Sequence, residues 1–446
     1  MFAGGHGRLQ HSAPPPQVAQ PTTPVAARIG SITALVRQIQ ENAEAYARFF
    51  RGQNLPEPSF DHGDHLMPGE ELPLHVAAAR EAAIEGAHEL HNLLLGPLGL
   101  LVECSGQQYL LLCIQYLYRH RIAYAVPVDG VASFAEIASA SSTNEKDVTR
   151  FLRLAASQHV FKEVRKGFVA HTAASKMLLN NPQLEAWIMN NAQEIWPALS
   201  RAVDATEKWP GSEEPKESGF SLAYGTNENP FDVIKKDARR QAQFAQAMSF
   251  SHLHPSYDIR YFVDHYDFGL IGRGTIVDIG GSQGQVSVAI AERFPDITCI
   301  VQDLPETIAH LNVPDSLSQR VLGMAHDFLK PQPVRGADIY LLRWILHDWS
   351  DKYSITILRN LVPALKKGAK IVINDICIPD PGQVSLRAER FLRAMDISMK
   401  AFNNARERDA ETWQWLFRMA DQRFAFKEIV LPQDARMAVI TAEWTG

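Results

Sequence analysis

The regular alternation of apolar strands and helical segments after Thr275 is the feature that most constrains this fold. Strands are predicted at 275–280, 297–302, 337–342 and 370–375. Strands that alternate with helices favour a parallel sheet whose two faces are both covered by helices. A final pair of strands, at 424–431 and 435–441, can close the sheet with a hairpin. The second half of the chain is therefore predicted to be an α/β domain.

The first half of the chain has a different pattern. Residues 1–26 are rich in Pro and polar side chains, so they cannot bury enough surface to fold. Between Phe134 and Ala170, two short helices precede a pair of strands around a Lys-Gly turn, an arrangement typical of a winged helix. We therefore predict a disordered tail at 1–26, a mainly helical domain with a winged helix at 27–250, and the α/β domain at 251–446.

Composition argues against several classes of partner. The net charge of -6 disfavours nucleic-acid binding, because contacts to phosphates need clustered excess Lys and Arg. The most apolar stretch, 93–102, is too short to cross a bilayer, which takes about 20 residues. The 4 cysteines form no CxxC pair, which indicates a reducing compartment. With no signal peptide visible, we expect a cytoplasmic protein without nucleic-acid, membrane or metal partners.

A glycine-rich turn joins the first predicted strand to its helix. The turn spans Asp278–Gly284, where glycines let the backbone approach a ligand closely beside a helix N-terminus. Such a turn alone fits NAD, FAD or S-adenosylmethionine, and it can also be only a tight turn. Asp303 ends the second strand, where its carboxylate can accept hydrogen bonds from ribose hydroxyls or cap the loop before Pro305. The turn lacks the Gly-x-Gly-x-x-Gly spacing that is usual for dinucleotides.

Four motifs in their order along the chain narrow this choice. They span Asp278–Gly284, Gln302–Pro305, His326–Phe328 and Leu342–Asp351. Over residues 80–446 the chain resembles the caffeic-acid-type O-methyltransferases of plants, and more closely their relatives in fungal secondary metabolism. The resemblance implies a Rossmann-like class I methyltransferase sheet and S-adenosylmethionine as cofactor. It also implies a hydroxyl acceptor on a small aromatic or polyketide-type molecule, and a homodimer in which the winged helix belongs to an N-terminal dimerisation domain.

The resemblance also assigns the binding residues. Asp303 is expected on the ribose, Asp327 and Phe328 on the adenine, and Arg343 stands where the family often has Lys. Met248 and Trp344 are expected to line the acceptor pocket. The full set expected to contact the cofactor is Gly280, Gly281, Gly284, Asp303, Leu304, Asp327, Phe328 and Arg343.

Methyl transfer to a phenol needs a base, because a phenol with a pKa near 10 is about one part in a thousand ionised at neutral pH. His347 follows the strand at 337–342, where ligands bind in open α/β sheets, and an imidazole can remove the proton. The resemblance maps two acidic helpers onto Asp375 and Glu407. Asp375 is shorter than the family's usual Glu by one methylene. Asp348 is expected to be structural, with its side chain pointing away from that of His347.

Two other functions stay open at this stage. One is a methyltransferase-fold pericyclase or dehydratase that binds S-adenosylmethionine without consuming it. It would not need the base and acids at His347, Asp375 and Glu407. The other is a winged-helix regulator, which the cofactor motifs and the acidic net charge disfavour. Formation of S-adenosylhomocysteine distinguishes the methyltransferase from both.

Overall fold

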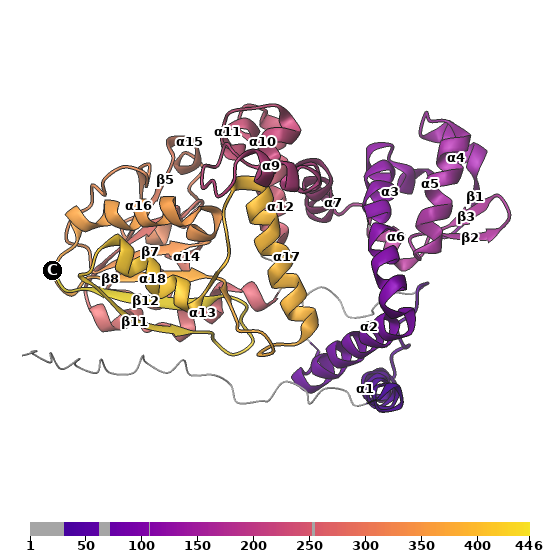
Figure 1. The fold of residues 1–446 in the computed structure, drawn as a ribbon, viewed down its shortest axis with the longest axis horizontal. Coiled ribbons are helices and arrows are strands. Elements are labelled where there is room, and N and C mark those ends of the chain that lie inside the picture. Colours follow the sequence, from indigo (N-terminus) through magenta and orange to yellow (C-terminus); the bar gives the residue numbers. More distant parts are fainter. Residues whose placement is uncertain (1–30, 62–71, 107, 252–254) are drawn as a thin grey trace, which may run out of the picture.

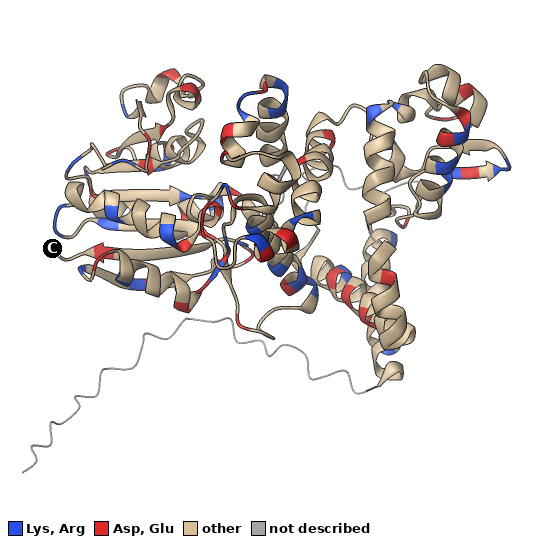
Figure 2. Cartoon of the chain, turned by 45° about the horizontal axis from the view of Figure 1, so that its top comes forward, with Lys and Arg blue, Asp and Glu red and all other residues tan. Residues whose placement is uncertain are grey.

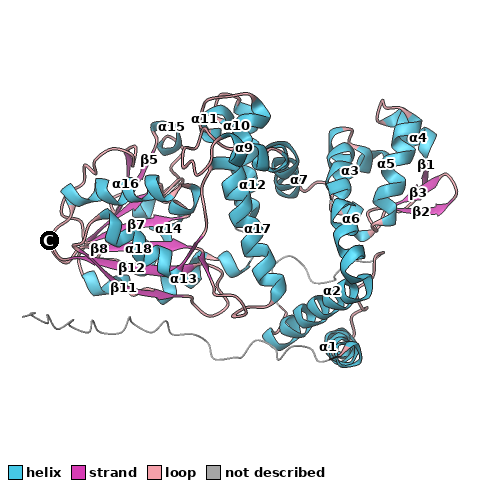
Figure 3. Cartoon of the chain, in the orientation of Figure 1, coloured by secondary structure: helices cyan, strands magenta, loops and turns pink. Residues whose placement is uncertain are grey.

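The computed structural model describes residues 31–61, 72–106, 108–251 and 255–446 (Figure 1). The tail predicted at 1–26 lies outside these residues. Strands and helices separate along the chain: the large sheet belongs to the second half, whereas helices dominate the first (Figure 3). No described helix is long and apolar enough to cross a membrane.

Seven of the described strands form one sheet with the order β11-β12-β8-β7-β4-β5-β6. All neighbours are parallel except β12, which runs antiparallel to β8 and β11, so the C-terminal hairpin closes one edge as predicted. The sheet confirms the predicted class I methyltransferase fold, and β6 is a strand that the sequence patterns did not indicate. Its members are β4 (Thr275–Ile279), β5 (Thr298–Asp303), β6 (Val321–Ala325), β7 (Ile339–Arg343), β8 (Lys370–Asp375), β11 (Phe424–Val430) and β12 (Ala438–Trp444).

Both faces of this sheet are buried, because successive residues of each strand point to opposite sides. On β7, Tyr340 and Leu342 join the core that contains α16 (Asp351–Leu361) and α18 (Ala410–Ala420). Ile339 and Leu341 join the opposite core, together with α13 (Ile259–His265) and α14 (Gln285–Arg293). Helices on both faces leave the strand ends as the accessible edge of the sheet.

The N-terminal half builds a separate core of helices and one small antiparallel sheet, with strand order β1-β3-β2. The two helices and the hairpin predicted between Phe134 and Ala170 are present, and β1 is an additional short strand. Lys and Arg are interspersed with Asp and Glu over this unit (Figure 2). The elements are α1 (Ile32–Gly52), α2 (Leu74–Glu103), α3 (Gln108–Arg119), β1 (Ala132–Ser133), α4 (Phe134–Ala140), α5 (Glu145–Ser157), β2 (Lys162–Arg165), β3 (Phe168–Ala170) and α6 (Ala173–Lys176).

A group of helices connects the two halves. Phe220 and Ile234 from this group pack with Ala401 and Phe402 of α17 (Leu386–Asn403), so one aromatic core includes residues on both sides of position 250. The connecting elements are α7 (Pro182–Asn190), α8 (Trp196–Ser200), α9 (Ala202–Lys208), α10 (Gly219–Tyr224), α11 (Pro230–Ile234) and α12 (Ala238–Ser251). This packing attaches α17, which borders the candidate site, to the helical half.

Candidate active site

The predicted site residues follow the carboxyl ends of the parallel strands. Between β4 and β7 the strand order reverses, and ligands of open α/β sheets bind outside the carboxyl ends at such a point. The glycine turn follows β4, Asp303 ends β5, Arg343 ends β7 and Asp375 ends β8. The fold therefore gathers onto one edge residues that are up to a hundred positions apart.

The glycine turn leaves no room for larger side chains. A Cβ at Gly281 would lie 2.7 Å from the Asp278 carboxyl carbon and 2.8 Å from Val301 Cγ1. Gly280 and Gly284 have φ of +71° and +81°, a backbone region that residues with a Cβ rarely adopt. A Cβ at Gly280 would also lie 2.3 Å from Ile345 Cδ1 and 3.8 Å from the ring of Phe328. The turn therefore forms a shallow backbone cradle beside an apolar wall.

Asp303 closes one side of this cradle. Its carboxylate accepts hydrogen bonds from the backbone N–H groups of Ser282, at 3.0 Å, and Leu304, at 2.8 Å. Burial raises the pKa of Asp303, and these hydrogen bonds oppose the rise. Leu304 stays exposed, which leaves its side chain available to cover a ligand. The structure thus places Asp303 and Leu304 at the rim of the glycine turn.

Asp327 and Phe328 follow β6, the neighbour of β5. Asp327 Oδ1 accepts a hydrogen bond from the N–H of Leu329, at 2.9 Å, and the Phe328 ring lies edge-on to Trp349 with centroids 5.8 Å apart. His326, just before them, has a buried Nε2 without a hydrogen-bond partner among the described residues. This end of the sheet therefore offers an aromatic surface and a buried polar nitrogen that a bound group can satisfy.

Arg343 ends β7, and Trp344 follows it. The Arg343 guanidinium donates to the Asn374 side chain and to the Tyr257 carbonyl, the latter at 2.8 Å. Burial lowers its pKa to about 10, although the carboxylates of Asp278 and other acids favour the charged form. Trp344 has a φ of +54°, unusual for a bulky residue, and its ring lies between those of Tyr257 and His347. Arg343 therefore ties neighbouring segments together, and Trp344 packs directly on the candidate base.

His347 is buried in a 3₁₀ turn, Leu346–Asp348. Its Nδ1 lies 3.0 Å from Glu407 Oε1, which fits an Nδ1–H donated to the carboxylate, so Nε2 is the acceptor nitrogen when the ring is neutral. Nε2 lies 3.5 Å from Asp348 Oδ1. The expectation that Asp348 points away was therefore wrong, because the tight turn folds this side chain back beside the ring. Asn403 Nδ2 holds the turn by donating to the Asp348 carbonyl at 2.6 Å.

Asp375 contacts the backbone of His347 rather than its ring. Its Oδ2 accepts from the His347 N–H at 3.2 Å, and its Oδ1 accepts from the Ile376 N–H at 3.0 Å. Two short parallel strands, β9 (Cys377–Ile378) and β10 (Arg408–Asp409), pair directly after Asp375 and Glu407. This pairing explains how two acids far apart in sequence reach one histidine.

The acids control the charge of His347. Burial alone would lower the pKa of His347, but the negative charges of Asp348, Asp375 and Glu407 outweigh it and raise the pKa to about 10. Burial raises the pKa of Asp375 to about 6, and it also raises the pKa of Asp348. The surrounding acids therefore favour the protonated form of His347.

Donor atoms of His347, Asp375 and Glu407 lie within 4.8 Å of one another, close enough to hold a cation. In this cluster His347 Nδ1 and Asp375 Oδ2 already form the hydrogen bonds described above. The expectation of a site without metal stays a prediction.

Two further residues were not singled out from the sequence. Asp396 on α17 accepts the backbone N–H of Glu407 at 2.9 Å, and Arg408 contacts the turn that carries His347. Met248 is half-buried on α12, and its place in the acceptor pocket stays a prediction. The motif around Glu407 contained Arg408, but its alternating charges resemble a solvated loop, and nothing local indicates burial.

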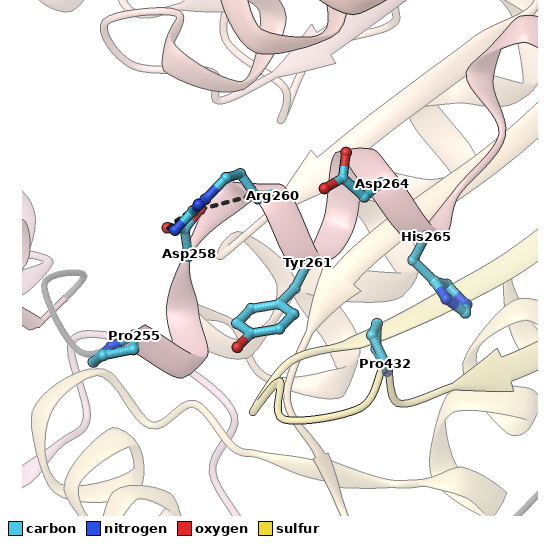
Figure 4. Close-up of a pocket in the computed structure, with 7 residues that line it drawn as sticks. All are labelled: Pro255, Asp258, Arg260, Tyr261, Asp264, His265 and Pro432. Atoms are coloured by element: carbon cyan, nitrogen blue, oxygen red, sulfur yellow. Dashed lines mark hydrogen bonds and ion pairs between the residues drawn. The ribbon is translucent and has the colours of Figure 1, made fainter. Parts of the chain in front are cut away.

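A cavity of about 440 Å³ lies against α13 and Pro432 (Figure 4). Its other lining residues are Pro255, Asp258, Arg260, Tyr261, Asp264 and His265, of which Asp258 and Arg260 form an ion pair at 2.8 Å. None of the predicted site residues lines it, so this cavity is separate from the cradle and from His347.

Comparison with known proteins defines the class. A family model described as "O-methyltransferase domain" matches residues 208–423. The chain is 36% identical over 420 residues to O-methyltransferase kk1A of Curvularia clavata, which covers 94% of this chain and 98% of that protein. This protein therefore belongs to the O-methyltransferase family.

Other relatives agree. The chain is 38% identical over 399 residues to the chlorophenol O-methyltransferase of Trichoderma longibrachiatum, covering 87% of this chain and 84% of that protein. Among solved structures, OxaC in complex with SAH and oxaline has a TM-score of 0.71 at 22% identity, covering 93% and 99% of the two chains. A structure titled "A Pericyclic Reaction enzyme" has a TM-score of 0.67 at 21% identity, covering 93% and 99%. At these identities the two structures establish the shared fold alone.

The protein is an S-adenosylmethionine-dependent O-methyltransferase. The residues present fit the cofactor: the glycine cradle has no space for a Cβ, Asp303 stands beside it, and the acidic cluster suits a cationic sulfonium. The recognition made from the four motifs is thereby confirmed.

Proposed function

We propose that this protein methylates a phenolic hydroxyl of a small aromatic or polyketide-type secondary metabolite, with His347 as the general base. The observation that carries the proposal is the buried His347, whose Nδ1 is held by Glu407, so that Nε2 can accept a proton when the ring is neutral. The related chlorophenol O-methyltransferase, named for a phenol, supports this acceptor class.

The residues that would hold the cofactor are Gly280, Gly281, Gly284, Asp303, Leu304, Asp327, Phe328 and Arg343. The contacts of Arg343 to Asn374 and to the Tyr257 carbonyl would also support the strand ends. When bound, S-adenosylmethionine supplies an electrophilic methyl group on a sulfonium cation. His347 Nε2 takes the acceptor's hydroxyl proton, Glu407 keeps the ring oriented, and Asp375 holds the backbone of the turn. Trp344 and Met248 would contribute to the acceptor pocket.

His347 must be neutral to act as a base. A positive charge placed near the acidic cluster disfavours the imidazolium and lowers its pKa. We therefore expect the pKa of His347 to be lower in the loaded enzyme than in the ligand-free protein, where it is about 10.

The test is His347→Ala assayed against a panel of small phenols, with S-adenosylhomocysteine and methylated product followed by mass spectrometry. Turnover should fall by about 10²–10⁴-fold, and raising the pH should recover part of it, because free phenolate replaces the missing base. Exposed His265 provides the control, and His265→Ala should keep wild-type turnover. Wild-type production of S-adenosylhomocysteine by His347→Ala would refute His347 as the base.

A pericyclase that retains the cofactor is the second candidate, since one solved structure with this fold is described as a pericyclic reaction enzyme. Such an enzyme would form no S-adenosylhomocysteine at any pH with any acceptor. The identity to O-methyltransferases over most of the chain favours methyl transfer.

We further propose that the N-terminal helices form a homodimer. Leu94, Leu98 and Leu101 on α2 are 67%, 75% and 71% exposed, a concentration of apolar surface that favours burial against a second copy. The four free cysteines fit a reducing compartment, so the cytoplasm is the proposed location.

A further inference from the structure

Arg408 is a charged residue whose side chain is completely buried. It follows Glu407 directly and lies in β10. Its Nε donates to Asp351 Oδ1 at 2.8 Å, and Trp413 lies beneath the guanidinium, 5.4 Å from its carbon. Burying a guanidinium is unfavourable unless its donors are satisfied, so these contacts must compensate for lost hydration.

The other donors of Arg408 contact the turn that carries His347, apart from a longer hydrogen bond of 3.3 Å from Nη1 to the Arg406 carbonyl. Nη1 donates to the Leu346 carbonyl at 2.7 Å, and Nη2 donates to the Trp349 carbonyl at 2.7 Å. These two carbonyls lie on either side of the turn. Nη2 also donates to Ser354 Oγ at 3.0 Å, whose hydroxyl lies 3.3 Å from the Leu346 carbonyl. The guanidinium therefore fixes both ends of the turn at once.

We propose that Arg408 is a positioning residue for the general base. Glu407 sets the direction of the His347 ring through Nδ1, while Arg408 sets the place of the turn through the carbonyls on its two sides. Two adjacent residues thus determine where Nε2 stands. Lys cannot replace Arg here, because an ammonium has three donors and lacks the planar fork that reaches both carbonyls. The inference rests on the proposed role of His347.

Arg406 provides a matched control, since it pairs with the same carboxylate, Asp351, at 2.9 Å but is half-exposed and makes no described contact with the turn. Arg408→Met and Arg408→Lys should each lower kcat by about 10–100-fold at saturating acceptor, because a loosened turn misplaces the base. Affinity for S-adenosylhomocysteine, measured by calorimetry, should stay within about threefold. Arg406→Met should stay within about twofold of wild type in both quantities.

A double-mutant cycle separates positioning from a general structural role. If Arg408 acts through His347, adding His347→Ala to Arg408→Met should cost at least about tenfold less than His347→Ala costs alone. If His347→Ala lowered kcat by the same factor in Arg408→Met as in the wild-type enzyme, the inference would be overturned. A His347→Ala variant with wild-type turnover would instead overturn the proposed base, so the two failures are distinguishable.

Folding of the variants is checked by thermal denaturation. Should Arg408→Met fail to fold, the same cycle is run with Ser354→Ala, which removes one acceptor of Nη2 while leaving the buried charge paired. Non-additivity with His347→Ala is again expected. If the loss from Ser354→Ala and the loss from Arg408→Lys were each additive with the loss from His347→Ala, the proposal would be contradicted.

Discussion

The carboxylates around His347 raise the pKa of its imidazole, so the pH dependence of the reaction should depend on them. The sequence alone suggests an ordinary imidazole, with a pKa near 6.5. In the fold, three acids raise the pKa of His347 to about 10, because negative charge stabilises the imidazolium. A base works only when neutral, so the acidic limb of kcat/KM should lie above pH 6.5 in the wild-type enzyme.

Glu407→Gln tests this electrostatic account. The substitution removes one negative charge at 3.0 Å from Nδ1, so the pKa of His347 should fall and the acidic limb should move to lower pH. The plateau should also drop by about tenfold or more, since the ring loses its carboxylate partner. The measurement is a pH profile of kcat/KM for the acceptor at saturating cofactor. Exposed Glu411 on α18 supplies the control, and Glu411→Gln should leave the limb in place. A limb that moves to higher pH in Glu407→Gln would contradict the account.

Asp303 carries a prediction about the cofactor alone. Asp303→Ala should remove two charge-assisted hydrogen bonds to the ribose, weakening cofactor binding by roughly 2–4 kcal/mol. Calorimetric titration with S-adenosylhomocysteine measures this loss. Glu306, exposed nearby on α15 (Pro305–Ile308), is the comparison, and Glu306→Gln should bind as wild type. Unchanged affinity in Asp303→Ala would show that the ribose is held elsewhere.

A chelator tests the alternative use of His347, Asp375 and Glu407 as a cation site. We expect turnover to be unaffected after treatment with EDTA and removal of the chelator, because Nδ1 is already occupied by Glu407. Lost activity that returns on adding a divalent metal would assign a cation to these residues.

At the scale of elements, the glycine turn after β4 depends on close packing. Gly281→Ala would place its Cβ within 2.8 Å of Asp278 and Val301, both of which are buried. Overpacking of this kind costs about 1–3 kcal/mol, and a displaced turn should also weaken cofactor binding. Gly52 ends α1 with open space around its Cα, so Gly52→Ala should leave the melting temperature and cofactor affinity unchanged. A wild-type melting temperature and cofactor affinity in Gly281→Ala would show that Asp278 and Val301 can shift to make room for the added Cβ.

Strand β8 illustrates what local pattern predicts well, because its apolar run between polar ends predicts the observed bounds Lys370–Asp375. Strand β6 was missed, since this edge strand has an exposed Leu322 and a Gly323 at its centre. At the site, the motifs singled out His347 and Glu407, whose side chains lie 3.0 Å apart in the structure, and their catalytic roles stay predictions. The orientation of Asp348 could not be predicted, because it depends on the tight turn at His347. The burial of Arg408 could not be predicted either, because it depends on contacts with residues remote in sequence.

For the whole molecule, three acids on successive turns of α2 meet the beginning of α17. Glu81 pairs with Arg387 and Glu89 with Arg390, each at 2.9 Å, while Glu85 accepts the backbone N–H of Leu386. Carboxylates at a helix N-terminus are favourable, although exposed ion pairs contribute little individually. Together these contacts set α2 against the helix that borders His347. Beyond its kink at Gly96, α2 presents the exposed leucines.

Those leucines carry the prediction of a homodimer. Light scattering should give about twice the chain mass of 49.8 kDa at micromolar concentration, and removing residues 1–26 should not change it. Replacing Leu94, Leu98 and Leu101 together by Lys should shift the protein towards monomer, because charges at a desolvated interface are unfavourable. Leu270 is 84% exposed in the 3₁₀ turn Phe268–Ile271 and is not part of α2, so Leu270→Lys is the matched control and should keep the dimer. A wild-type mass near 50 kDa would reject the dimer. A triple variant that remains dimeric would place the interface on another surface.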